Sequence, residues 1–179
     1  MTDIAKRRRI FIGIMCPDDV WQPWQQRVAA LGYAPLLEQP HITLAFLGGL
    51  TNDELTQVIT VLNRIQPQTF VQNVAGGGYF SLKRQTILWA KVASSIHLST
   101  LREQILTALQ PINLQFETKF VPHISLVRAK SLPRVDCEKF VSQVNDLTFD
   151  FTVDGFGIYE SMPINTHPRY QLVDKISLK

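Results

Sequence analysis

The stretch PHITLAFLG, residues 40–48, alternates between two kinds of side chain, as a β-strand with two different faces does. Ile42 and Leu44 would point to one face, where they suit a buried core. His41 and Thr43 would point to the other. A strand this apolar should be buried, so a histidine and a threonine at its start indicate that the second face has a role other than packing.

The stretch VPHISLVRA, residues 121–129, repeats the same pattern. Both copies read Pro-His-Ile-Thr/Ser-Leu. In each copy the histidine (His41 or His123) and the hydroxyl residue (Thr43 or Ser125) are two positions apart, which in a strand puts them on one face about 6.6 Å apart. Two matching polar pairs at equivalent places favour a functional role over chance packing.

The elements around the two copies also recur in the same order. Residues 74–80 (VAGGGYF) correspond to 153–159 (VDGFGIY), and we pair 86–92 with 169–176. Periodicity predicts helices over 17–32, 51–65, 96–110 and 135–144, and further strands over 9–16, 69–75, 86–92, 147–153, 155–159 and 170–176. We interpret this as an internal duplication: an α+β fold in which two pseudo-symmetric lobes face each other across a pseudo-two-fold axis and share one core.

Composition bounds the class of protein. The chain has 179 residues, of which 45% are apolar and 18% charged, as in a single globular domain. A net charge of +3 fits an anionic partner without requiring one. Two cysteines outside any C-x-x-C pattern favour a reducing cytoplasmic compartment. No apolar run reaches the ~18 residues of a membrane span, and the short run at 10–16 is better interpreted as a buried strand than as a signal segment.

Two histidines and two hydroxyls in one cleft suit a particular chemistry. A neutral imidazole takes a proton from an attacking water or hydroxyl, and an imidazolium gives a proton to a leaving oxygen. The hydroxyls donate hydrogen bonds to an anionic group between them. A phosphate centre with an attacking and a leaving oxygen roughly in line meets this description.

A metal site is the main competing interpretation of the histidine segments. Neither segment carries a second His, Cys, Asp or Glu at ligand spacing, and hydroxyl residues are poor zinc ligands. The other two histidines are not part of the motif. We expect His97 on a helix surface and His167 in a loop.

The paired HITL and HISL motifs, their flanks, the strand IFIGI and the chain length together resemble the two-histidine (2H) phosphoesterase superfamily, and within it the RNA 2′,3′-cyclic phosphodiesterase (2′-5′ RNA ligase) family. The resemblance covers essentially the whole chain. It implies antiparallel sheets with outer helices around a central cleft, and hydrolysis of RNA 2′,3′-cyclic phosphate ends to 2′-phosphates. Such enzymes are also associated with joining RNA ends through a 2′-5′ linkage. No metal or other cofactor is implied.

The resemblance also assigns roles to residues of this chain. His41 and His123 would be the acid–base pair, without telling which is which, and Thr43 and Ser125 would bind the phosphate. Arg128 would pair with the phosphate and Phe46 would stack on the terminal base. Strict alternation puts these last two on the face opposite the histidines, so a bulge or the strand's end must redirect them. For Phe46 a place in the core is an equal alternative.

Basic residues outside the motifs complete the expectations. The cleft rim would include Lys83, Arg84, Lys130 and Arg134, with solvated surface as the alternative. The run 7–9 (RRR) is interpreted as capping the first strand.

We expect a cytoplasmic, monomeric enzyme that acts on RNA or oligonucleotide ends and has no membrane partner. Two alternatives stay open. One is another 2H activity, on 2′-5′ oligonucleotides or small cyclic phosphates. The other is a non-catalytic module that binds RNA or nucleotides.

Overall fold

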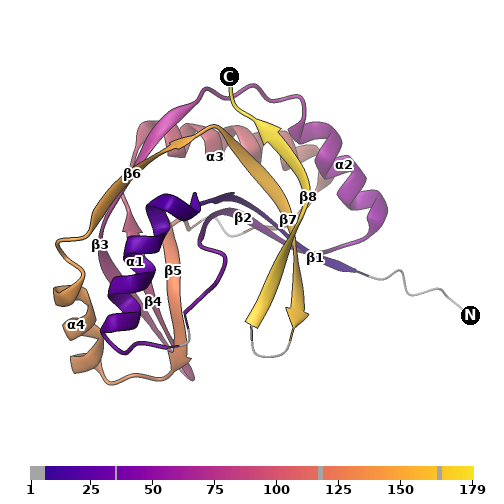
Figure 1. Cartoon of the computed structure of the whole chain (residues 1–179). Helices are drawn as coiled ribbons and strands as arrows, with labels where there is room; N and C mark the ends of the chain where they lie inside the picture. The colour runs from indigo at the N-terminus through magenta and orange to yellow at the C-terminus, as the bar shows by residue number, and fades with distance from the viewer. Residues whose placement is uncertain (1–6, 35, 117–118, 165–166) are drawn as a thin grey trace, which may run out of the picture.

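The computed structural model describes residues 7–34, 36–116, 119–164 and 167–179. These residues form one eight-stranded antiparallel sheet with helices packed on it, which confirms the predicted α+β class. The strands are β1 (Arg8–Met15), β2 (His41–Leu50), β3 (Phe70–Leu82), β4 (Gln85–Val92), β5 (His123–Lys130), β6 (Thr148–Val153), β7 (Gly155–Ile164) and β8 (His167–Ser177). Their order across the sheet is β6-β3-β4-β5-β2-β1-β7-β8. Figure 1 shows this sheet bent into an arch, with β3 and β4 on one side and the β7–β8 hairpin on the other.

The helices begin and end close to the predicted positions. They are α1 (Asp18–Ala30), α2 (Asn52–Leu62), α3 (Ile96–Leu109) and α4 (Arg134–Gln143), with a short 3-10 helix η1 (Gln110–Ile112) after α3. The start of α2 is a capping box: the Glu54 N–H donates to Thr51 Oγ1 at 3.2 Å, and the Thr51 N–H donates to Glu54 Oε2 at 2.7 Å. This reciprocal pair satisfies two backbone donors that the first helical turn would otherwise leave free.

The helices pack on the sheet in two pairs. Helix α4 packs on β3, and α1 packs on β6, where the rings of Trp21 and Trp24 meet Phe149 edge-on. Helices α2 and α3 pack on each other and on β2. Ile42 and Ile124, at the centre of the sheet, are fully buried in the core that these helices complete. The residues next to them in β2 and β5 therefore point to the opposite face of the sheet.

The two halves of the sheet meet where β2 and β5 pair. On one side of that line the order is β5-β4-β3-β6, and on the other it is β2-β1-β7-β8. Strands β3 and β7 hold equivalent places, which confirms the match between 74–80 and 153–159. The match between 86–92 and 169–176 is wrong. Strand β4 lies beside β5 as β1 lies beside β2, so β4 corresponds to β1, whereas β8 lies at the sheet edge. Alternating strands resemble one another in sequence, and only their neighbours in the sheet distinguish them.

The triple glycine at 76–78 bends β3 but does not end it, contrary to the expected strand over 69–75. Gly76 has φ of 71°, and the β3–β4 register shifts between Val74 and Gly77. At Gly78 an added Cβ would collide with the ring of Trp89, so the glycine lets this ring lie directly against the backbone. The glycines thus serve a bulge and a close aromatic contact within one long strand.

Candidate active site

The two histidines open the two central strands of the sheet. His41 is the first residue of β2 and His123 the first of β5, and these strands pair antiparallel through Ile42 and Ile124. One step either side of this pair, His41 comes opposite Ser125 and Thr43 opposite His123. All four are partly exposed, on the face of the sheet away from the helices. The predicted pairs are therefore neighbours on one surface, related by the pseudo-two-fold axis.

Each imidazole is held by a backbone carbonyl two residues before it. His41 Nδ1 lies 2.8 Å from the Gln39 oxygen, and His123 Nδ1 lies 2.7 Å from the Val121 oxygen. A carbonyl oxygen only accepts, so Nδ1 must carry the proton in both rings. The neutral form is then the Nδ1–H tautomer, and Nε2 is left as the atom that can take or give a proton.

Burial disfavours the charged form of both imidazoles. It lowers the pKa of His41 to about 4, against the opposing effect of the Gln39 carbonyl, and the charges of Arg128 and His123 lower it further. Burial also lowers the pKa of His123, the Val121 carbonyl opposes this, and Arg128 again adds to the lowering. The charge of His123 thus disfavours a second positive charge on the His41 ring.

Aromatic rings cause much of this burial. Phe11 and Tyr170 lie 4.9 and 4.7 Å from the His41 ring, centroid to centroid. On the other side of the axis, Phe80 lies 4.9 Å and Trp89 5.9 Å from the His123 ring. Each histidine thus lies between aromatic rings, which cover part of its surface and restrict its orientation.

A bulge in β2 brings Phe46 to the histidine face. Leu44 and Ala45 are both buried, and the β1–β2 register shifts between the pairs Ile12–Ala45 and Gly13–Thr43. Two consecutive inward residues reverse the alternation, so Phe46 points outward and is 43% exposed. The core alternative for Phe46 is therefore wrong.

Strand β5 has the same irregularity at the equivalent place. Leu126 and Val127 are both buried, and the β4–β5 register shifts between the pairs Leu88–Val127 and Trp89–Ser125. Arg128 is thereby redirected to the histidine face and is exposed. Its charge acts on both imidazoles. The bulges resolve the conflict that strict alternation posed.

The carbonyl that each bulge frees has a donor from elsewhere in the chain. The Leu44 oxygen accepts a hydrogen bond from Arg102 Nε on α3 at 3.1 Å. The Leu126 oxygen accepts one from the Leu37 N–H at 2.8 Å. Each bulge is therefore also held by a residue from outside its own strand.

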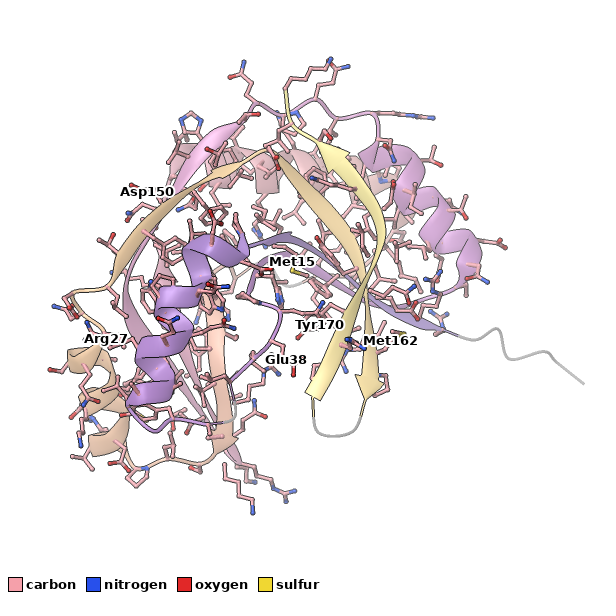
Figure 2. All side chains as sticks on the ribbon, in the orientation of Figure 1. Met15, Arg27, Glu38, Asp150, Met162 and Tyr170 are labelled. Carbon is pink, nitrogen blue, oxygen red and sulfur yellow. The ribbon has the colours of Figure 1, made fainter. Side chains whose placement is uncertain are left out.

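Gln39 and Tyr170 belong to the site but were not predicted. Gln39 Oε1 accepts from the Tyr170 N–H at 2.7 Å, and Gln39 Nε2 donates to the Tyr170 carbonyl at 3.0 Å. This clamp joins β8 to the segment that holds His41, and Figure 2 shows Tyr170 on the side of β8 that faces Met15, the last residue of β1. The only sequence signal was an amide side chain directly before Pro40-His41.

The remaining candidates lie away from the histidines or on the surface. His97 is exposed on α3, as expected. His167 starts β8 and is not in a loop, because the hairpin continues to it in register with Ile164. Lys83, Arg84 and Lys130 are exposed, and Arg134 pairs with Glu138 at 2.6 Å.

Within the described ranges, no three His, Cys, Asp or Glu side chains gather as ligands for a metal ion. In the same part of the chain, no helix combines the length and apolar character needed to cross a bilayer.

Comparison with known proteins places this arrangement in a family. A model of the 2′-5′ RNA ligase superfamily matches residues 16–162, a range that includes both histidine motifs. The chain belongs to this superfamily. A superfamily relative from Thermotoga maritima, named RNA 2′,3′-cyclic phosphodiesterase, is 32% identical over 139 residues, covering 76% of this chain and 74% of the relative. One from Aquifex aeolicus with the same name is 28% identical, covering 77% of each chain.

Solved structures share the fold of this superfamily member. The crystal structure of Escherichia coli LigT complexed with 3′-AMP matches with a TM-score of 0.73 at 18% identity, covering 97% of this chain and 98% of LigT. The crystal structure of a protein from Thermus thermophilus matches with a TM-score of 0.74 at 22% identity, covering 95% of this chain and 97% of that protein.

Proposed function

We propose that this protein is an RNA 2′,3′-cyclic phosphodiesterase that hydrolyses the cyclic phosphate at RNA 3′ ends to a 2′-phosphate. The observation that carries the proposal is the symmetric pair of imidazoles on adjacent strands, each with Nδ1 held by a carbonyl and Nε2 left for proton transfer. The names of the Thermotoga and Aquifex relatives support the same reaction and substrate.

The reaction needs one neutral and one protonated imidazole. Nε2 of the neutral ring takes a proton from water, the water oxygen forms a bond to phosphorus, and the bond from phosphorus to O3′ breaks. The imidazolium of the other ring gives its Nε2 proton to O3′. Because His41 and His123 are related by the pseudo-two-fold axis, the side on which the substrate places O3′ decides which ring is the acid.

Four further residues would hold the substrate. The hydroxyls of Thr43 and Ser125 donate to the non-bridging phosphate oxygens, and the Arg128 guanidinium neutralises their charge. Phe46 offers an exposed ring for the terminal base, a contact worth about 1–3 kcal/mol in single-stranded nucleic-acid binding. The chain is then one domain, 1–179, whose two pseudo-symmetric lobes each contribute one histidine motif.

We also infer that the enzyme works as a cytoplasmic monomer without a metal ion. One chain supplies both histidines, so no second copy is needed to complete the pair. Cys16 and Cys137 are buried free thiols, as suits a reducing compartment.

The test is hydrolysis of a 2′,3′-cyclic phosphate on an adenosine mononucleotide and on a short oligoribonucleotide, in EDTA, with the product isomer identified by ³¹P NMR. We expect turnover in EDTA and a 2′-phosphate product. A 3′-phosphate would show that O2′ departs. Binding without turnover would favour the non-catalytic module, and cleavage restricted to 2′-5′ oligonucleotides would favour the other 2H activity.

The depressed pKa values predict the pH dependence of kcat/KM, which reports the free enzyme. The state with one neutral and one protonated ring is lost below the pKa of about 4, where both rings are protonated, and above the lowered pKa of His123, where both are neutral. The maximum should therefore lie on the acidic side of 6.5, the ordinary imidazole pKa, with kcat/KM falling as pH rises toward 8.

Bound substrate changes this profile in a predictable direction. The phosphate anion favours imidazolium, so it raises both pKa values and shifts the alkaline limb of kcat to higher pH than that of kcat/KM. Initial rates from pH 4 to 9 at constant ionic strength measure both profiles. A kcat/KM that rises steadily from pH 5.5 to 8 would contradict the depressed pair.

A further inference from the structure

The three consecutive arginines at the start of β1 have different surroundings. Arg7 donates to the Gly49 carbonyl at 2.7 Å and lies 3.5 Å from Glu54. Arg8 makes two hydrogen bonds to Glu160 Oε2, at 2.9 and 2.7 Å. Arg9 makes no ion pair with any residue that the structure describes, and it is exposed. One unneutralised cation thus remains in a run whose other members have acidic partners.

Arg9 lies on the face of the sheet that carries the histidines. Along β1 it is two residues before Phe11, whose ring contacts His41, so alternation puts both on one face about 6.6 Å apart. The Arg9 guanidinium carbon lies 4.9 Å from the centre of the Phe46 ring. Burial raises the pKa of Tyr170, and the charges of Arg128 and Arg9 oppose that shift, so both cations act on the same phenol.

Phe46 also borders a hollow. The hollow has a volume of about 480 Å³ and is lined by Phe46, Leu47, Gly48, Gln115 and Phe116. Its aromatic lining and size suit a flat ring such as a nucleobase. Arg9 and this hollow therefore meet at the same aromatic side chain.

We propose that Arg9 binds the phosphodiester on the 5′ side of the terminal nucleotide, whose base stacks on Phe46. The inference rests on the proposed function and names its substrate class: an RNA chain with at least one internucleotide phosphate, in preference to a nucleoside cyclic phosphate. Arg128 and the two motif histidines contact the cyclic phosphate instead. A nucleoside 2′,3′-cyclic phosphate has no 5′ phosphate, so it offers Arg9 no anionic partner.

The position of Arg9 favours an anion over a structural role. A guanidinium stacked on a ring keeps its N–H donors at the edge free for a phosphate, which it binds in a forked geometry. Nothing acidic in the described part of the chain competes for these donors.

The experiment compares two substrates in three proteins. The substrates are adenosine 2′,3′-cyclic phosphate and the dinucleotide ApA ending in a 2′,3′-cyclic phosphate. The proteins are the wild type, Arg9→Gln, and Arg7→Gln as the matched control, which removes the same charge from the same run. A hydrogen bond to a charged group contributes about 1.5–3 kcal/mol, so the dinucleotide-to-mononucleotide ratio of kcat/KM should fall about tenfold or more in Arg9→Gln. The ratio should keep its wild-type value in Arg7→Gln.

Salt dependence gives an independent readout. One extra phosphate contact should make the slope of log kcat/KM against log salt about 0.7 steeper for the dinucleotide than for the mononucleotide in the wild type. The two slopes should become equal in Arg9→Gln.

The outcomes separate this inference from the proposed function. An equal loss on both substrates would mean that Arg9 only supports Phe46, and an unchanged ratio would mean that it binds no phosphate; either overturns the inference. Equilibrium binding of ApA with a terminal 2′-phosphate, followed by tryptophan fluorescence, is measured in parallel. If the wild type turns over neither substrate, the proposed function fails. The binding measurement would still test the subsite: an Arg9→Gln affinity for this dinucleotide equal to that of the wild type would overturn it, and a weaker affinity would support it.

Discussion

Replacing either His41 or His123 by alanine is expected to lower kcat/KM on a 2′,3′-cyclic phosphate by at least about 10²–10⁴-fold, the usual contribution of a positioned proton-transfer group. Each change removes one of the two Nε2 atoms that the backbone carbonyls leave for proton transfer. The double variant should be little worse than either single one, because a base without its acid partner loses most of its use. Steady-state rates on the three variants measure this.

The control for the histidine pair is His97→Ala. His97 is exposed on α3, where its ring stacks on Phe70 with ring centroids 5.8 Å apart. This variant should keep wild-type activity, and circular dichroism should show the same fold in all four proteins. Activity within tenfold of the wild type in either motif variant would remove that histidine from the acid–base pair.

Replacing Arg128 by methionine is expected to change both the rate and its pH dependence. The loss of a charged hydrogen-bond partner for the phosphate should lower kcat/KM by about 10–100-fold. The charge of Arg128 lowers the pKa of both imidazoles, so its removal raises both, and the pH maximum of kcat/KM should move upward. A variant that merely damaged the fold would lose rate without moving the maximum.

Two further variants sharpen the test of Arg128. Arg128→Lys keeps the charge but loses the forked geometry, so its pH maximum should stay near that of the wild type while its rate remains below it. Arg64 is exposed and follows the end of α2, outside the two strands that carry the motifs. Arg64→Met removes one positive charge there and should alter neither the rate nor the pH maximum. An unshifted maximum in Arg128→Met would contradict the electrostatic coupling.

Much of the secondary structure could be predicted because its causes are local. In helices α2 and α3 the N-cap residues, Thr51 and Ser95, directly precede the residues that form the apolar stripe, so a short segment of sequence is enough to predict each helix. The triple glycine was harder to interpret, because a glycine that bends a strand and one that ends it look alike in sequence. The ring of Trp89 that needs Gly78 comes from another strand.

The repeat predicted two lobes, but it did not predict how their strands are arranged in the sheet. Strand β3 pairs with β4, and β7 pairs with β1, so each of these two equivalent strands joins the half of the sheet that contains the first strand of the other repeat. The correspondence of 86–92 with 169–176 failed for this reason. Alternation in the sequence indicates which residues of a strand face inward, but it does not indicate which strands are neighbours in the sheet.

By itself the sequence determined which residues we propose for the chemistry, because the two His-x-Thr/Ser motifs need only a strand to put each histidine beside its own hydroxyl. Tertiary structure alone decided everything that depends on contacts between distant segments. The bulges that turn Phe46 and Arg128 outward are held by Arg102 and Leu37, the clamp on Tyr170 joins β8 to Gln39, and Arg9 meets Phe46 across two strands. The physical reason is that these hydrogen bonds and ring contacts form only when the chain has folded.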